Sequence, residues 1–158
     1  MINRREIRAS VMQAVFSSYI SHNEVQQVYD HVLKDVEPLI LALEAQKGIE
    51  GDMQMMKTLF YETLKNEELY DSFLQGKADN WELKRIAWLD RVIIHLAICE
   101  VLNFEDIPVK VTMNEYLELS KQYSTPKSNI FINGILDRLF QDFKEKGLII
   151  KKGRGLME

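Results

Sequence analysis

Apolar side chains recur at helical spacing along almost the whole chain, and this periodicity constrains the fold more than any other feature. Between residues 4 and 19, apolar side chains fall at the i, i+3, i+4 positions of one buried stripe: Ile7, Val11, Ala14, Val15 and Phe16, with Tyr19 following. Only seven glycines and three prolines interrupt 158 residues, which disfavours disorder and a turn-rich β fold. The sequence therefore predicts an all-α helical bundle.

The pattern divides into successive helices separated by loops rich in glycine or polar residues. Pro38 is expected to kink or split the second helix, and a capping box from Thr112 to Glu115 is expected to open the fifth. The last helix is expected to end at a Gly147 cap. The expected helices cover residues 4–19, 23–46, 53–73, 81–102, 112–123 and the segment from the 124–129 loop to the cap.

The length of the chain is that of one domain, or of two small subdomains that share a core. We expect a single helical domain over residues 1–147, with an N-terminal subdomain at about 1–76 and a C-terminal one at about 80–147. Residues 148–158 contain lysines, an arginine and glycines, which predicts a basic, flexible tail.

The sequence contains none of the motifs by which common enzyme active sites are recognised. The single Cys99 excludes an internal disulfide, and neither a glycine-rich phosphate loop nor a His-Glu-x-x-His metal site occurs. His22 and His31 are scattered, and His95 lies in the most apolar helix, where a hydrogen-bonded core histidine is expected. No apolar run approaches 18 residues. We therefore expect a cytoplasmic protein that is not an enzyme, with no metal, cofactor or membrane partner.

The net charge of −4 conceals an uneven distribution of charge. Residues 1–10 hold three arginines and one glutamate, and residues 121–158 hold eight basic and four acidic side chains. The middle of the chain is acidic. If the two ends meet, they form a basic patch suited to nucleic acid. Solvated termini are the other interpretation, and charge alone favours it.

Several residues suit the binding of single-stranded RNA. Three arginines stand in the first turns of a helix, where they oppose the helix dipole, so a partner is a better reason for them than stability. Ser128 and Asn129 stand at the expected start of the last helix, where free N–H groups attract anions. Four aromatics lie near these segments, each individually more common in cores than as a stacking platform for bases: Phe16, Tyr19, Tyr123 and Phe131.

An Asn133-Gly134 pair interrupts the apolar pattern of the last helix. Glycine costs about 0.8–1.0 kcal/mol relative to alanine inside a helix, so a backbone is expected to come close to something there. We expect Gly134 to let the last helix pack tightly against a neighbouring helix.

Four motifs in a fixed order resemble the NusB family of bacterial transcription antitermination factors. The segment from residue 22 to 75 is too generic to add to the resemblance. The motifs are Arg4-Arg5…Arg8…Gln13-Ala14-Val15-Phe16, Leu89-Asp90-Arg91-Val92-Ile93…Leu96-Ala97-Ile98-Cys99-Glu100, Ile107-Pro108-Val109-Lys110-Val111…Asn114-Glu115-Tyr116-Leu117-Glu118-Leu119-Ser120-Lys121-Gln122-Tyr123, and Phe131-Ile132-Asn133-Gly134-Ile135-Leu136-Asp137.

The resemblance implies two three-helix subdomains and a non-enzymatic adaptor that binds boxA-type single-stranded rRNA leader RNA. It also implies a partner, the small-subunit ribosomal protein NusE, within the RNA polymerase elongation complex. Asp90 and Arg91 would face NusE. The RNA-binding residues implied by position are Arg4, Arg5, Arg8, Phe16, Lys127, Ser128, Asn129 and Phe131.

The chain departs from the family pattern at two positions. Glu6 interrupts the arginine run, which should weaken phosphate binding, and Ile130 replaces a commonly polar or basic residue beside Phe131. The basic tail after Gly147 is hypothesised to compensate. Two other functions stay open, an RNA-targeting domain of an rRNA methyltransferase and a helical scaffold that binds only protein. Formation of a homodimer also stays open.

Overall fold

The computed structural model describes residues 2–77 and 85–157, and these residues contain helices and no strand. The predicted all-α fold is confirmed. None of the helices within this part of the chain is long and apolar enough to cross a membrane. Contacts divide the chain into two compact units, Met1–Lys65 and Asn66–Glu158.

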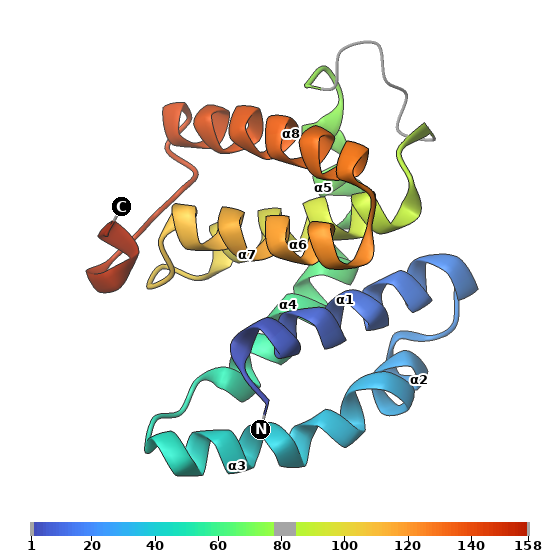
Figure 1. Cartoon of the computed structure of the whole chain (residues 1–158), viewed down its shortest axis with the longest axis vertical. Helices are drawn as coiled ribbons and strands as arrows, with labels where there is room; N and C mark the ends of the chain where they lie inside the picture. The colour runs from blue at the N-terminus through green and yellow to red at the C-terminus, as the bar shows by residue number, and fades with distance from the viewer. Residues whose placement is uncertain (1, 78–84, 158) are drawn as a thin grey trace. The chain divides into compact units, whose positions relative to one another are not determined.

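The first unit is built around α1 (Arg4–Ser21), which packs against α4 (Asp52–Lys65) (Figure 1). Between them the chain passes through α2 (Val25–Val28), a π-helical turn, a 3₁₀ turn and α3 (Glu37–Lys47). The core of this unit contains side chains that are essentially inaccessible to solvent: Ile7, Val11, Val15, Leu33, Ile40, Met56, Leu59 and Phe60.

The expected helix over 23–46 is split, which is one of the two outcomes expected from Pro38. Its middle forms a π-helical turn, Tyr29–Leu33, and a 3₁₀ turn, Lys34–Val36. Pro38 stands in the first turn of α3, where a missing N–H costs no helical hydrogen bond. Proline thus begins a new helix here instead of kinking an existing one.

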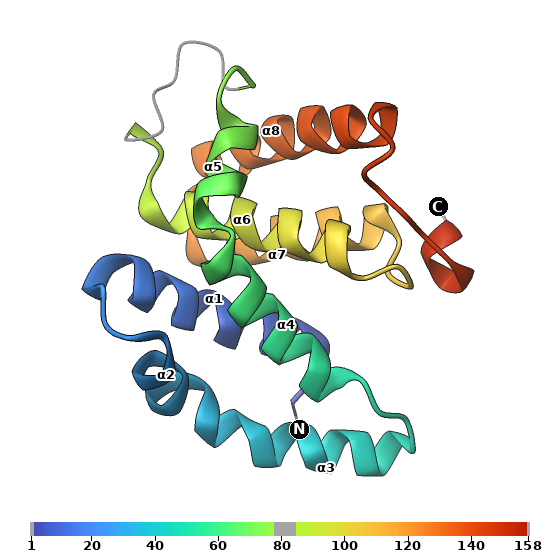
Figure 2. The same ribbon diagram turned by 180° about the vertical axis from the view of Figure 1, so that it is seen from behind.

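The second unit surrounds α6 (Trp88–Asn103), which packs against α7 (Val109–Tyr123) and α8 (Pro126–Glu145). Helix α5 (Glu67–Leu74) packs on α6 and α8, as Figure 2 shows from behind. Every side chain from Asp90 to Val101 is buried, as expected for a central helix that is apolar nearly all round.

Three expected boundaries differ from those observed. The expected helix over 53–73 is interrupted at Asn66, whose backbone leaves the helical region, so α5 belongs to the second unit. The subdomain boundary expected near residue 76 therefore lies at Lys65 in the structure. Helix α6 begins at Trp88 because Ala87 before it is extended, and the earlier expected start at Trp81 lies outside the described residues.

The predicted capping box at Thr112 is wrong. Helix α7 already begins at Val109, after Pro108 in an extended conformation. Thr112 is buried, and its hydroxyl donates a hydrogen bond of 2.6 Å to the carboxylate of Glu100. The threonine is therefore used to satisfy a buried charge and not to cap a helix.

The C-terminal tail, expected to be flexible, is packed against the loop after α6. The Lys152 amide donates to the Glu105 carbonyl at 2.9 Å, and Lys151 Nζ donates to the Phe104 carbonyl at 2.6 Å. Burial lowers the pKa of Lys151, although nearby carboxylates act in the opposite sense. Residues Gly153–Leu156 close with a 3₁₀ turn in which Gly155 is buried.

Replacing Gly155 with alanine should release this tail. A Cβ atom at residue 155 would stand 1.8 Å from the Glu105 carbonyl oxygen, so one of the two backbones must move. We expect amide exchange at Lys152 to become at least about tenfold faster because its hydrogen bond opens locally. Hydrogen-exchange mass spectrometry measures this, and an unchanged exchange rate at Lys152 would contradict the prediction.

Candidate nucleic-acid interface

Helix α1 begins with a capping box formed by Asn3 and Glu6. Asn3 Oδ1 accepts a hydrogen bond of 2.9 Å from the Glu6 amide, and the Asn3 amide donates to Glu6 Oε2 at 3.1 Å. This reciprocal pair satisfies two backbone donors that the helix itself leaves unbonded. Glu6 therefore has a local structural reason for interrupting the arginine run.

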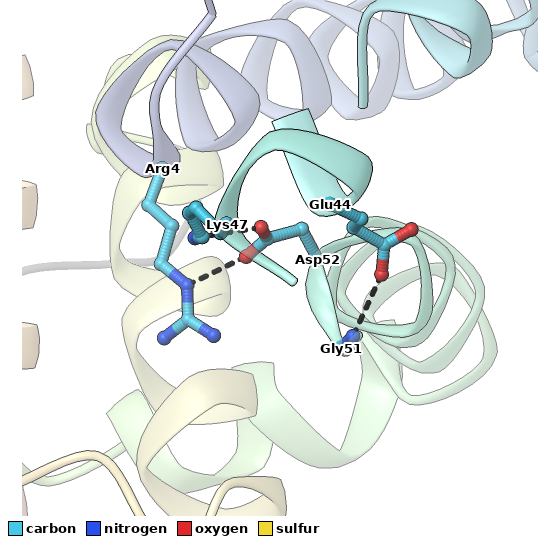
Figure 3. Close-up of polar contacts among 5 residues, drawn as sticks. All are labelled: Arg4, Glu44, Lys47, Gly51 and Asp52. Atoms are coloured by element: carbon cyan, nitrogen blue, oxygen red, sulfur yellow. Dashed lines mark hydrogen bonds and ion pairs between the residues drawn. The ribbon is translucent and has the colours of Figure 1, made fainter. Parts of the chain in front are cut away.

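Arg4 belongs to a cluster with Asp52 and Lys47, which join the ends of three helices (Figure 3). Arg4 Nε lies 2.8 Å from Asp52 Oδ1, and Lys47 Nζ lies 2.9 Å from Asp52 Oδ2. The Asp52 side chain is 2% exposed, whereas those of Arg4 and Lys47 are 41% and 39% exposed. A buried carboxylate therefore anchors two cations whose charged groups reach solvent.

The electrostatics of Asp52 follow from this geometry. Burial would raise the pKa of the Asp52 carboxyl, but hydrogen bonds from Arg4 and Lys47 outweigh it and hold the pKa below its usual range. A carboxyl with a lowered folded-state pKa stabilises the fold above its unfolded pKa, and this contribution is lost as pH falls through the folded value.

The other residues predicted on α1 differ in exposure. Arg5 is exposed and Phe16 is 36% exposed, so both present their side chains to solvent. Arg8, in contrast, is only 3% exposed. The structure thus offers Arg4, Arg5 and Phe16 as surface groups of one helix and places Arg8 in the interior.

The start of α8 in the second unit is not the open anion site that the sequence predicted. Thr125 caps the helix, and its hydroxyl oxygen accepts a hydrogen bond of 3.0 Å from the Ser128 amide. The Asn129 side chain donates to the Leu117 carbonyl at 3.0 Å. Ser128 and Asn129 therefore hold the turn in place, while Lys127 is exposed and Phe131 is half-buried.

Asp90 and Arg91, the residues expected to face a protein partner, are also largely interior. Asp90 is 5% exposed, and its two carboxylate oxygens accept hydrogen bonds from Ser124 at 2.9 Å and Ser128 at 2.6 Å. Arg91 is 8% exposed, with its guanidinium 4.7 Å from the ring centroid of Trp88. Asp90 is thus a positioning residue for the α7–α8 turn, and Trp88, 42% exposed, is the surface group beside it.

Gly134 does not mediate tight helix packing, contrary to the sequence expectation. It is exposed on α8, and a Cβ atom added there would meet nothing within 4 Å. Ile130, one turn earlier, is 75% exposed. The outer face of α8 therefore combines an exposed apolar side chain with a backbone that no side chain covers, which leaves room for a partner to approach closely.

Replacing Gly134 with alanine should stabilise the fold. The added methyl meets no neighbour, and alanine is favoured over glycine inside a helix by about 0.8–1.0 kcal/mol. We expect the free energy of unfolding measured in urea to rise by about that amount. A decrease would show that the outer face of α8 is packed in solution.

The described residues hold no group of three or more histidine, cysteine, aspartate or glutamate side chains able to bind a metal ion. His95 is fully buried, and its Nε2 lies 2.8 Å from Asp71 Oδ1, which confirms the expected hydrogen-bonded core histidine. Cys99 is buried in the same helix. His95 and Cys99 therefore belong to the packed core of the second unit.

Sequence reasoning missed Lys47 and Asp52. Both lie in or beside the loop predicted after the second helix, more than 40 residues from Arg4. The sequence signal was the acidic Asp52 beside the expected start of the third helix. That signal does not indicate which cation Asp52 binds.

The structure thus defines a small all-helical protein that exposes cations and an aromatic side chain along its first helix. Comparisons with known proteins identify the family. The family model described as NusB family matches residues 5–141. The chain belongs to the NusB family.

Individual relatives agree with this assignment. Transcription antitermination protein NusB of Salinibacter ruber is 34% identical over 99% of this chain and 92% of its own length. A crystal form of Thermotoga maritima NusB ("T. maritima NusB, P3121, Form 2") matches with a TM-score of 0.73 and 26% identity, covering 89% of this chain and 92% of that one. A chain from the crystal structure of a plectonemic RNA supercoil shares the fold, with a TM-score of 0.72 at 16% identity over 91% of this chain and 98% of that one.

Proposed function

We propose that this protein is a cytoplasmic, RNA-binding transcription antitermination factor. It binds boxA-type single-stranded rRNA leader RNA together with NusE in the RNA polymerase elongation complex. The observation that carries the proposal is the surface of α1, where Arg4, Arg5 and Phe16 are accessible in a chain of the NusB family.

The chemistry of this surface suits an unpaired RNA strand. Guanidinium groups bind phosphates, and an exposed aromatic ring stacks on a base without regard to its identity. Arg8 is buried, so the direct phosphate contacts are assigned to Arg4 and Arg5. On α8, Lys127 and Phe131 supply a cation and an aromatic side chain, and Ser128 and Asn129 order the turn that carries them.

The contact with NusE is proposed at the start of α6. Asp90 orders the α7–α8 turn from the interior. Trp88, which is 42% exposed, presents an aromatic surface, and the largely buried Arg91 guanidinium lies against its ring. Tryptophan and arginine are the side chains most often found at the energetic centre of protein interfaces. The acidic middle of the chain complements a basic ribosomal protein.

Binding of a labelled boxA-type RNA, measured by fluorescence anisotropy over a range of salt concentrations, tests the proposal. We expect affinity to fall as salt rises, with a log–log slope of about 0.7 per phosphate contact, and to increase when NusE is added. Absence of salt-dependent RNA binding both with and without NusE would overturn it and favour the protein-only scaffold. Light scattering of the free protein in the same buffers reports whether a homodimer competes with RNA.

The alternative of an RNA-targeting domain in an rRNA methyltransferase gains no support from the relatives. The Salinibacter ruber protein is matched over 92% of its length and is itself named for transcription antitermination. This alternative would require the full protein to transfer a methyl group from a methyl donor to RNA.

A further inference from the structure

The Asp52 cluster places a lysine beside an arginine that already belongs to the proposed RNA surface. Arg4 begins α1, Lys47 ends α3 and Asp52 begins α4, so the cluster depends on the first unit being folded (Figure 3). Two cations at such close quarters would repel each other. The buried carboxylate between them removes that repulsion and fixes both side chains.

The orientation of Arg4 within the cluster directs its terminal N–H donors away from Asp52. Asp52 accepts from Nε, so the two terminal guanidinium nitrogens point away from the carboxylate (Figure 3). The hydrogen bond and ion pair between Arg4 and Asp52 involve Nε alone. Lys47 likewise donates one of its three N–H groups to Asp52.

The charge of the cluster favours an anion. One carboxylate and two cations leave a net charge of +1, presented by groups that are about 40% exposed. A phosphodiester carries a single negative charge and accepts hydrogen bonds from both guanidinium and ammonium groups.

We propose that Arg4 and Lys47 together bind one phosphate of the RNA backbone and that Asp52 is the positioning residue that aims them at it. This inference rests on the proposed function and adds two residues to the RNA surface. Lys47 becomes a phosphate-binding residue. Asp52, although negatively charged, promotes the binding of a negatively charged ligand.

Replacement of Asp52 by asparagine distinguishes a positioning role of Asp52 from plain charge repulsion of the RNA, because the two predict opposite changes in RNA affinity. Removing a negative charge near a phosphate site should tighten RNA binding unless that charge positions the cations. We expect D52N to weaken binding of the boxA-type RNA by about fivefold. The matched control is E6Q, which removes a charge from the same surface while the amide oxygen still accepts the cap hydrogen bond, and which should tighten binding by about twofold.

Replacement of Lys47 by glutamine tests the second cation without unpairing Asp52 from Arg4. We expect K47Q to lower the salt slope of RNA binding by about 0.7, the value for one phosphate contact. Lys65 lies at the far end of α4, about 20 Å from Asp52 along the helix, and the matched variant K65Q should leave the slope unchanged.

The outcomes distinguish this inference from the proposed function. If the wild-type protein binds RNA in a salt-dependent manner but D52N binds as tightly as wild type or more tightly, the positioning role of Asp52 is overturned. If K47Q matches K65Q, the role of Lys47 is overturned. Thermal unfolding of each variant is recorded, and should D52N be unfolded at the assay temperature, K47Q alone decides the case. Absence of RNA binding by the wild type would instead overturn the proposed function.

Discussion

The double variant R5Q/F16L is expected to bind boxA-type RNA about 100-fold more weakly than the wild-type protein. Stacking of a base on an aromatic side chain contributes about 1–3 kcal/mol, and loss of one phosphate contact lowers the salt slope by about 0.7. Both side chains are exposed on α1, so their replacement should leave the packing of the first unit intact. Fluorescence anisotropy across a salt series measures both quantities.

A control variant distinguishes stacking from a general loss of exposed aromatic surface. Tyr61 has the same 36% exposure as Phe16 and belongs to the same unit, but it lies on α4. The variant Y61L should therefore retain RNA affinity. Equal losses in Y61L and F16L would argue that Phe16 has no specific role, and an unchanged affinity in R5Q/F16L would remove α1 from the RNA surface.

The double variant T112V/Y116F is expected to destabilise the protein by about 3–5 kcal/mol. The Glu100 carboxylate is fully buried between α6 and α7, where Thr112 donates to it at 2.6 Å and Tyr116 at 3.1 Å. Hydrogen bonds to a charged group contribute about 1.5–3 kcal/mol each, and loss of these two donors leaves part of the desolvation cost of the buried carboxylate uncompensated. Urea unfolding followed by circular dichroism measures the loss.

The triple variant E100M/T112V/Y116F tests the cause of that loss. Replacing a buried polar group together with its partners by apolar groups of similar shape is often close to neutral. We therefore expect the triple variant to recover most of the stability that the double variant loses. A triple variant as unstable as the double variant would show that shape, and not the loss of the two hydrogen bonds to the carboxylate, dominates at this position.

Helix content could be predicted from the sequence because it depends on local periodicity, whereas several boundaries could not. The interruption at Asn66 and the π-helical turn at Tyr29–Leu33 occur inside segments whose apolar pattern is continuous. Thr112 carries a valid capping signal, yet a carboxylate 12 residues earlier in the chain uses its hydroxyl. Tertiary contacts determine these helix boundaries and the role of Thr112, and the local sequence pattern does not contain that information.

The same division applies to the candidate site. The exposure of Arg5 agrees with its predicted place off the buried stripe of α1. Phe16 was counted in that stripe and is nevertheless 36% exposed, so only the family resemblance pointed to it as a surface group. Ser128 and Asp90 were assigned to different partners, whereas the structure joins them to each other across 38 residues. Lys47 and Asp52 were missed because their relation to Arg4 exists only after three helices have come together.

The packed C-terminal tail has a consequence for the order in which the chain folds during synthesis. The carbonyl groups of Phe104 and Glu105, just past the end of α6, bond to groups of Lys151 and Lys152. Residues 2–65, by contrast, contain all the contacts of the Asp52 cluster. Domains generally fold as they emerge from the ribosome, N-terminal first. The arginine surface of α1 can therefore be complete while the loop after α6 still awaits its contacts with Lys151 and Lys152.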